Sequence, residues 1–111
     1  MFSRKRKNGD ETMMNEDTTT MFQDSKFPMG RIVITANALK KLPPPDVEQA
    51  LVRHAHGDWG DLNHEEHVEN ALALEKCLRL ASLYHTANDT RFWVVTEADR
   101  SHTTILLPGD Y

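Results

Sequence analysis

The stretch Arg91–Leu107 reads RFWVVTEADRSHTTILL. Two runs in it, Arg91–Glu97 and His102–Leu107, are rich in β-branched and aromatic residues, and the turn-forming residues ADRS separate them at 98–101. β-branched and aromatic side chains favour strands, whereas Asp and Ser favour tight turns. This stretch therefore predicts a β-hairpin.

The residues before this hairpin extend it to a meander. Arg79–Thr86 alternates in the same way and is joined to the next strand by the turn formers ANDT at 87–90. Its first part, Leu78–Leu83, also suits a helix that continues from the preceding segment. Near the other end of the chain, Arg31–Thr35 is short and β-branched, and it predicts a further strand.

Helix signals fill the region between Thr35 and Arg79. Thr35 can cap a short helix over Ala36–Leu42, which the prolines at 43–45 stop. Asp46 with Gln49, and Asn63 with Glu66, resemble the capping boxes of two further helices. The order predicts an α+β fold: an N-terminal strand, two to three short helices, and a three-stranded antiparallel meander with the helices packed on one face.

Apolar residues at helical spacing predict which side chains of these helices face the core. In the second helix they are Val47, Ala50, Leu51 and His54 or Ala55. In the third helix they are Val68, Ala71, Leu72 and, beyond its end, Leu78. Cys77 lies among leucines, so we expect a small buried residue there and not a nucleophile.

Length and composition limit the class of protein. A chain of 111 residues is long enough for one domain, and we expect a disordered polar tail at 1–27 and a folded domain at 28–111. The net charge of −4 disfavours non-specific binding to nucleic acid. A single cysteine fits a reducing compartment, and no apolar run approaches the length of a signal sequence or a membrane span. These features predict a cytoplasmic protein.

Three segments together resemble a family of short uncharacterised proteins carried by bacterial plasmids and other mobile elements. They are GRIVIT at 30–35, HGDWGDL at 56–62 and WVVTEADRSHTTILLP at 93–108. The resemblance covers residues 29–111. It implies a bacterial, cytoplasmic protein encoded on a mobile element, and it implies no particular activity.

The loop Gly57–Leu62 is the first candidate site. Its two glycines bracket Trp59, and Asp58 and Asp61 can accept hydrogen bonds from the loop or from the next helix. In one interpretation Trp59 is an anchor that binds a partner. In the other, Trp59 folds back over the small core.

The hairpin turn is the second candidate site. It gathers Glu97, Arg100, His102 and Thr103 within a few residues. An acid, a guanidinium, a hydroxyl and an imidazole can bind phosphate or transfer a proton. The alternative is an ordinary cross-turn ion pair between Glu97 and Arg100.

Histidines form the third candidate group. His64 and His67 share one face of a helix, and His54 and His56 end the helix before it. Two histidines at this spacing can hold zinc only if further ligands arrive, and the chain has one cysteine. We therefore expect neither a metal nor a cofactor.

Two functions remain open. The first is a non-enzymatic interaction or regulatory module that binds another protein, with Trp59, Asp58, Asp61, Arg100 and Thr103 as binding residues; the oligomeric state stays open. The second is a ribonuclease similar to RelE and barnase, in which the acid, base and phosphate clamp would be Glu97, Arg100, His102 and His85. The acidic composition favours the first.

Overall fold

A computed structural model describes residue 22 and residues 24–111. Its mixed sheet contains β1 (Arg31–Ile34), β2 (Leu80–His85), β3 (Arg91–Thr96) and β4 (His102–Leu106). The strand order is β1-β4-β3-β2; β1 runs parallel to β4, and the other neighbours are antiparallel. Three helices connect β1 to β2, and a 3-10 turn follows β4. These elements are α2 (Ala36–Lys41), α3 (Pro44–Ala55), α4 (His64–Lys76) and η1 (Pro108–Asp110).

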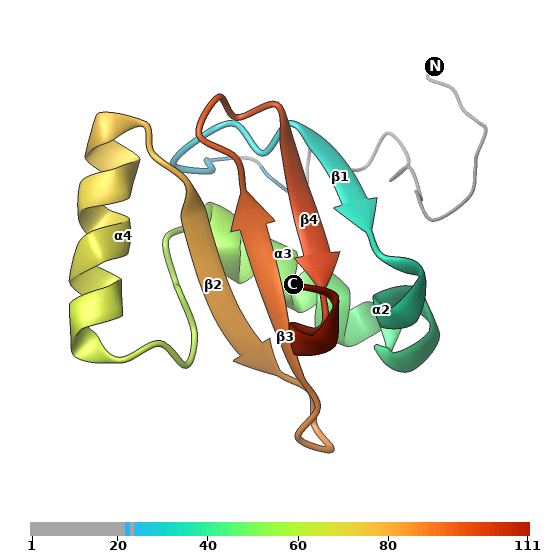
Figure 1. Ribbon diagram of the computed structural model, residues 1–111. Helices are drawn as coiled ribbons and strands as arrows, with labels where there is room; N and C mark the ends of the chain where they lie inside the picture. The colour runs from blue at the N-terminus through green and yellow to red at the C-terminus, as the bar shows by residue number, and fades with distance from the viewer. Residues whose placement is uncertain (1–21, 23) are drawn as a thin grey trace.

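The predicted α+β class is confirmed, but the predicted arrangement is correct only in part. β2, β3 and β4 pair as consecutive antiparallel strands. β1 adds to this group in parallel, with Val33 opposite Thr104, so the sheet is mixed. Figure 1 shows α3 crossing behind the sheet and α4 standing beside the β2 edge, so the helices do not all cover one face. A strand's side-chain pattern specifies which face it buries and not which neighbour it pairs with.

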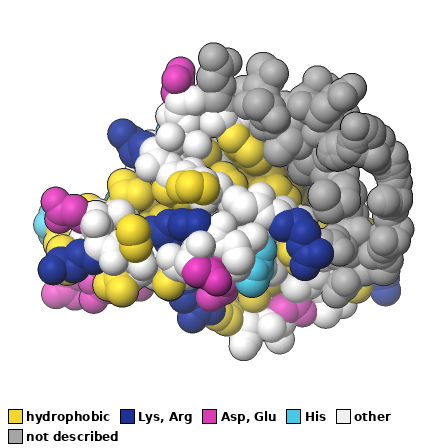
Figure 2. Space-filling view, turned by 90° about the horizontal axis from the view of Figure 1, so that it is seen from above, with side chains coloured by type: hydrophobic (Ala, Val, Ile, Leu, Met, Phe, Trp, Pro, Cys, Tyr) yellow, Lys and Arg dark blue, Asp and Glu magenta, His cyan; other side chains and the backbone are white. Residues whose placement is uncertain are grey.

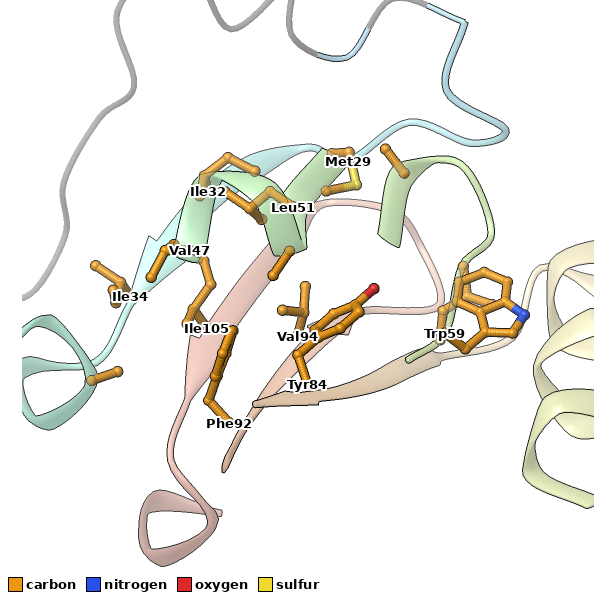
Figure 3. Packing of buried hydrophobic residues seen from close by; sticks show 14 of the residues in the cluster. Met29, Ile32, Ile34, Val47, Leu51, Trp59, Tyr84, Phe92, Val94 and Ile105 are labelled. Carbon is orange, nitrogen blue, oxygen red and sulfur yellow. The ribbon is translucent and has the colours of Figure 1, made fainter. Parts of the chain in front are cut away.

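The core lies between α3 and the sheet face that points toward it. Alternation along each strand brings one set of side chains to this face, and α3 supplies residues at helical spacing. In Figure 3 the residues from α3 lie opposite those from the sheet. The buried set includes Val47, Leu51, Ile32, Tyr84, Phe92, Val94 and Ile105.

The folded domain begins earlier than the sequence predicts. The Lys26 amide donates to the Ala55 carbonyl oxygen at 2.8 Å, and the Phe27 side chain is only 5% exposed. The sequence places Phe27 in the tail because one aromatic residue in a polar surrounding shows neither strand nor helix periodicity. The predicted disorder of residues 1–21 and 23 lies outside the described residues.

The second helix starts two residues before its predicted cap. Pro44 and Pro45 occupy the first positions of α3, and Asp46 lies in its first turn instead of capping it. Proline suits these positions because the first amides of a helix have no partner within the helix. The prolines thus separate α2 from α3 and also begin α3.

The third helix has the predicted cap but the opposite orientation. Asn63 and Glu66 form the capping box. Asn70 and Ala73 face the rest of the protein, whereas Val68 and Leu72 are 54% and 47% exposed. The expected inward face is wrong, because Asn70 binds both backbone groups of one β2 residue and this fixes the helix rotation.

The end of this helix also differs from the expectation. Cys77 ends α4 in a left-handed conformation, and its side chain is exposed and not buried. Leu78, expected in the core, is 51% exposed. The left-handed residue turns the chain directly into β2, so the segment from Leu80 onward is a strand and does not continue the helix.

The outer edge of β2 is covered. The Asn70 amide accepts from the Ala81 N–H at 3.3 Å and donates to the Ala81 carbonyl at 2.7 Å. Further along the strand, the Leu83 N–H donates to the Trp59 carbonyl, and the Asp61 N–H donates to the Leu83 carbonyl. An edge strand with unpaired groups invites pairing with other chains, so these contacts protect the sheet.

Gly60 makes this edge contact possible, which gives the first prediction. Its φ of +79° is unfavourable for other residues, and a Cβ there would lie 2.0 Å from the Leu83 carbonyl oxygen. Gly60→Ala is expected to lower the free energy of unfolding by about 3 kcal/mol or more in urea denaturation. Gly109→Ala is the matched control, because nothing lies within 4 Å of that position, and should change it by less than about 0.5 kcal/mol. Equal effects of the two substitutions would contradict this packing.

Candidate functional site

Trp59 belongs to the core. Its side chain is 5% exposed and stacks on Phe27, with ring centroids 6.3 Å apart. The His54 ring meets it edge-on at 5.5 Å. Of the two interpretations of this residue, burial favours the core position, because an anchor for a partner must present its ring to solvent.

The two carboxylates of the Trp59 loop have partners within the fold. Asp58 accepts from the Arg53 guanidinium at 2.7 Å, and this hydrogen bond holds the pKa of the carboxyl below its usual value. Asp61 contacts Nδ1 of His85 at 2.6 Å, and the same contact raises the pKa of that exposed imidazole. Both pairs fasten the loop, one to α3 and the other to β2.

Thr103 lies in a buried chain of polar groups. Its hydroxyl donates to the Met29 carbonyl at 2.6 Å, and it lies 2.7 Å from the Thr96 hydroxyl. Nε2 of His54 is 2.9 Å from Thr96, and Nδ1 is 2.6 Å from the Ser82 hydroxyl. His54, Ser82, Thr96 and Thr103 are all fully buried, so Thr103 cannot contact a ligand in this structure.

One arrangement of protons satisfies every hydrogen bond in this buried series. Because the Thr103 hydroxyl donates to a carbonyl, Thr96 must donate to Thr103, and Nε2–H of His54 must donate to Thr96. Nδ1 of His54 then accepts from Ser82. The neutral imidazole fits these roles. Burial, with a smaller effect of the Arg100 charge, lowers the pKa of His54 to about 3.

Arg100 clamps backbone carbonyls. Its guanidinium donates to the Leu78 carbonyl at 2.7 Å, the Glu97 carbonyl at 3.1 Å and the Ala73 carbonyl at 3.4 Å. It also lies 5.6 Å from the centre of the Phe27 ring. The contact with Ala73 reaches the last turn of α4, where a cation is favourable. The side chain therefore joins the hairpin to the end of α4.

The four residues of the ribonuclease hypothesis do not gather. Glu97 and His102 lie at the hairpin turn, where Glu97 N–H donates to the His102 carbonyl. His85 is at the opposite end of the sheet, opposite Arg91. Glu97 faces Arg79 at 3.8 Å, and the expected ion pair between Glu97 and Arg100 is replaced by this contact and by the carbonyl clamp.

The histidines considered as zinc ligands have different surroundings. His54 is buried with both ring nitrogens hydrogen-bonded, and His56 Nδ1 lies 2.8 Å from the Val52 carbonyl. Among the residues that the structure describes, no three His, Cys, Asp or Glu side chains are grouped as a metal site requires. His64 and His67 lie in the first half of α4.

A polar hollow of about 210 Å³ lies between α3 and the end of β2. Its charged residues include Arg53, Asp46 and His85. Arg53 is paired with Asp58 and stacks over the Tyr84 ring at 4.8 Å. Arg53 and His85 are both paired with carboxylates, so neither of these side chains is free to bind an anion in the hollow.

The outer face of α4 is the most distinctive surface. Of the described residues, the large hydrophobic side chains that are exposed are Leu39, Val68, Leu72, Leu78 and Tyr111. Val68 and Leu72 lie one turn apart on α4, and we call these two residues together with Ala71 the α4 stripe. A shallow apolar hollow runs beside it, lined also by Leu74 and Glu75. Figure 2 shows hydrophobic side chains at the surface on the left, where α4 lies, among charged ones.

The sequence pattern contains the signal for this surface. Val68, Ala71 and Leu72 are spaced as an apolar helix face, and that spacing alone predicts core packing. Asn70, on the other side of the helix, is polar, and its type gives no sign that it is buried. Within the described part of the chain, no helix is long and apolar enough to span a membrane.

Comparisons with models of known protein families found no match. No curated protein and no solved structure matches the chain either.

Trp59→Ala tests the core position of the tryptophan. Removing a buried aromatic side chain should lower the free energy of unfolding by about 3–5 kcal/mol in urea denaturation. Leu39→Ala, at a position 48% exposed on α2, is the control and should change it by less than about 0.5 kcal/mol. A loss below about 1 kcal/mol for Trp59→Ala would show that the ring is not part of the core.

The depressed pKa of His54 predicts a specific loss of stability in acid. The folded imidazole stays neutral down to about pH 3, whereas the unfolded one takes up a proton below about pH 6.5. The unfolded state therefore binds more protons, and stability falls as pH decreases through this window. We expect His54 to contribute a loss of about 2 kcal/mol between pH 7.5 and pH 5.

The comparison of variants isolates this contribution. His54→Gln should show a smaller loss over the same pH range than the wild type, in urea unfolding at each pH. His102→Gln, at a partly exposed position outside the buried hydrogen bonds of His54, is the matched control for replacing a histidine with glutamine. An unchanged slope for His54→Gln would contradict a buried neutral His54.

Proposed function

We propose that this protein is an interaction module that binds another protein chain through the α4 stripe. The observation that carries the proposal is the exposure of Val68 and Leu72 on a well-capped helix. Exposed apolar groups that form a continuous strip on a regular element are typical of protein-binding surfaces. A helix face of this kind binds a partner helix or a groove with residues at i and i+4 as anchors.

The way α4 is held supports this role. Asn70 and the Arg100 clamp fix its inner side and its last turn. The outer face is therefore presented by a rigid element, and little conformational entropy is lost when a partner covers it. Charged residues border the apolar stripe, as the polar rim of an interface does. They are Glu65, Glu69, Glu75 and Lys76.

The ribonuclease alternative has less support. Of the four proposed residues, Glu97, Arg100 and His102 lie at the hairpin turn, whereas His85 lies at the opposite end of the sheet. Arg79 faces Glu97, and Arg100 is bound to backbone carbonyls.

A photo-crosslinking amino acid placed at Leu72 tests the interaction role. In cells that produce the full chain, irradiation should give covalent adducts of higher mass, because the side chain at this position lies against the partner. The same amino acid at Leu39 is the control: that leucine is equally exposed, on α2, and should give few adducts. Thermal melting of both labelled proteins checks that they fold. Absence of adducts from position 72, or equal adducts from both positions, would contradict the proposal.

A further inference from the structure

We infer that the partner of the α4 stripe is α4 of a second copy of this chain, packed in antiparallel orientation. The inference rests on the proposed function, because it names the occupant of the same surface. It follows from the order of apolar and charged residues along α4. A two-fold axis that lies between the two helices, level with their middles, would make this surface complementary to itself.

Helix geometry places the residues of α4 on known sides. At 100° per residue, Val68 and Leu72 form the centre of the outer face. Glu65 and Lys76 border them on one side, together with Glu69. On the other side the border is formed by His64, Ala71 and Glu75.

Antiparallel pairing brings opposite charges to the same level. Glu65 and Lys76 are near opposite ends of α4, at almost equal distances from its middle residue, Asn70. When two copies pair around this middle, Glu65 of one copy meets Lys76 of the second copy on the same side, and symmetry repeats the contact. On the other side, His64 meets Glu75, and an imidazole N–H can donate a hydrogen bond to that carboxylate.

The same arrangement brings the apolar residues of the two copies into contact. Val68 and Leu72 lie on either side of the helix middle, so Val68 of each copy packs beside Leu72 and Ala71 of the other copy. Ala71 is small and lets the two backbones approach closely. Antiparallel pairing also aligns the helix dipoles favourably, whereas parallel pairing would place the acidic residues Glu65 and Glu69 of both copies together.

The expected dimer is weak. α4 has 13 residues, which corresponds to a length of about 20 Å. One helix face of this length buries less than the roughly 800 Å² per partner of a standard interface. The dimer should therefore dissociate in the micromolar range and depend on protein concentration.

Sedimentation equilibrium of the full chain from about 5 to 300 µM tests the inference. The average mass of the wild type should rise from that of the 12.7 kDa chain toward twice this value. Leu72→Asp should weaken association at least tenfold, because it places a charge at the centre of the contact. Leu39→Asp adds the same charge at an equally exposed leucine on α2 and should associate as the wild type does. A wild type that stays monomeric, or equal effects of the two substitutions, would overturn the inference.

Charge exchange tests the antiparallel register. Glu65→Lys should weaken the dimer several-fold, because two lysines would then meet at each of the two symmetric contacts; Lys76→Glu should do so because two glutamates would meet there. An equal mixture of the two variants should recover association, because both contacts of a mixed pair join a lysine to a glutamate. In the variant that carries both substitutions, every contact again joins a lysine to a glutamate. The double variant should therefore recover association most fully. Failure of the double variant to recover would overturn the register.

The crosslinking experiment separates the two proposals. If the wild type stays monomeric but position 72 captures a different protein, the α4 stripe is an interaction surface and self-pairing is wrong. If position 72 captures nothing, both proposals fail. An adduct of twice the chain mass from position 72 supports both.

Discussion

A single buried imidazole connects parts of the chain that are far apart in sequence. The imidazole of His54 on α3 is hydrogen-bonded to Ser82 of β2 and to Thr96 of β3. From Thr96 the hydrogen bonds continue through Thr103 of β4 to the carbonyl oxygen of Met29. A buried polar group without a partner costs about 1–3 kcal/mol, so each link favours the one arrangement that satisfies all of them. The positions of α3, the sheet and the segment entering β1 therefore depend on this series of buried hydrogen bonds.

The residues packed around His54 explain why the Trp59 loop and the hairpin turn, which the sequence offers as candidate sites, are parts of the fold. Phe27 lies against the rings of Trp59 and His54, and the Arg100 guanidinium lies over it. The Trp59 loop and the hairpin turn are thus joined through a residue of the entering segment. The aromatic and charged side chains of both segments have partners in the fold, whereas on the outer face of α4 Val68 and Leu72 are exposed to solvent.

The strands and the caps at Thr35 and Asn63 are predictable because they depend on neighbouring residues, whereas the cap expected at Asp46 is wrong. The alternation in Arg91–Leu107 and the Asn63 cap were identified correctly for this reason. The rotation of α4 was not predictable, because an apolar spacing gives the period of a helix and not the direction in which it faces. The polar residue Asn70 decides that direction by binding the β2 backbone. Similarly, the clamp made by Arg100 needs carbonyls that only the folded chain brings together.

We propose that α4 presents an interaction surface, whereas the Trp59 loop and the hairpin turn are parts of the scaffold. A dilution series followed by ¹H–¹⁵N correlation spectra of the full chain distinguishes these roles. Concentration-dependent shifts are expected at amides of residues 64–78, with little change at the Trp59 loop and at residues 97–103. Shifts centred on those two segments, with α4 unchanged, would contradict the proposal.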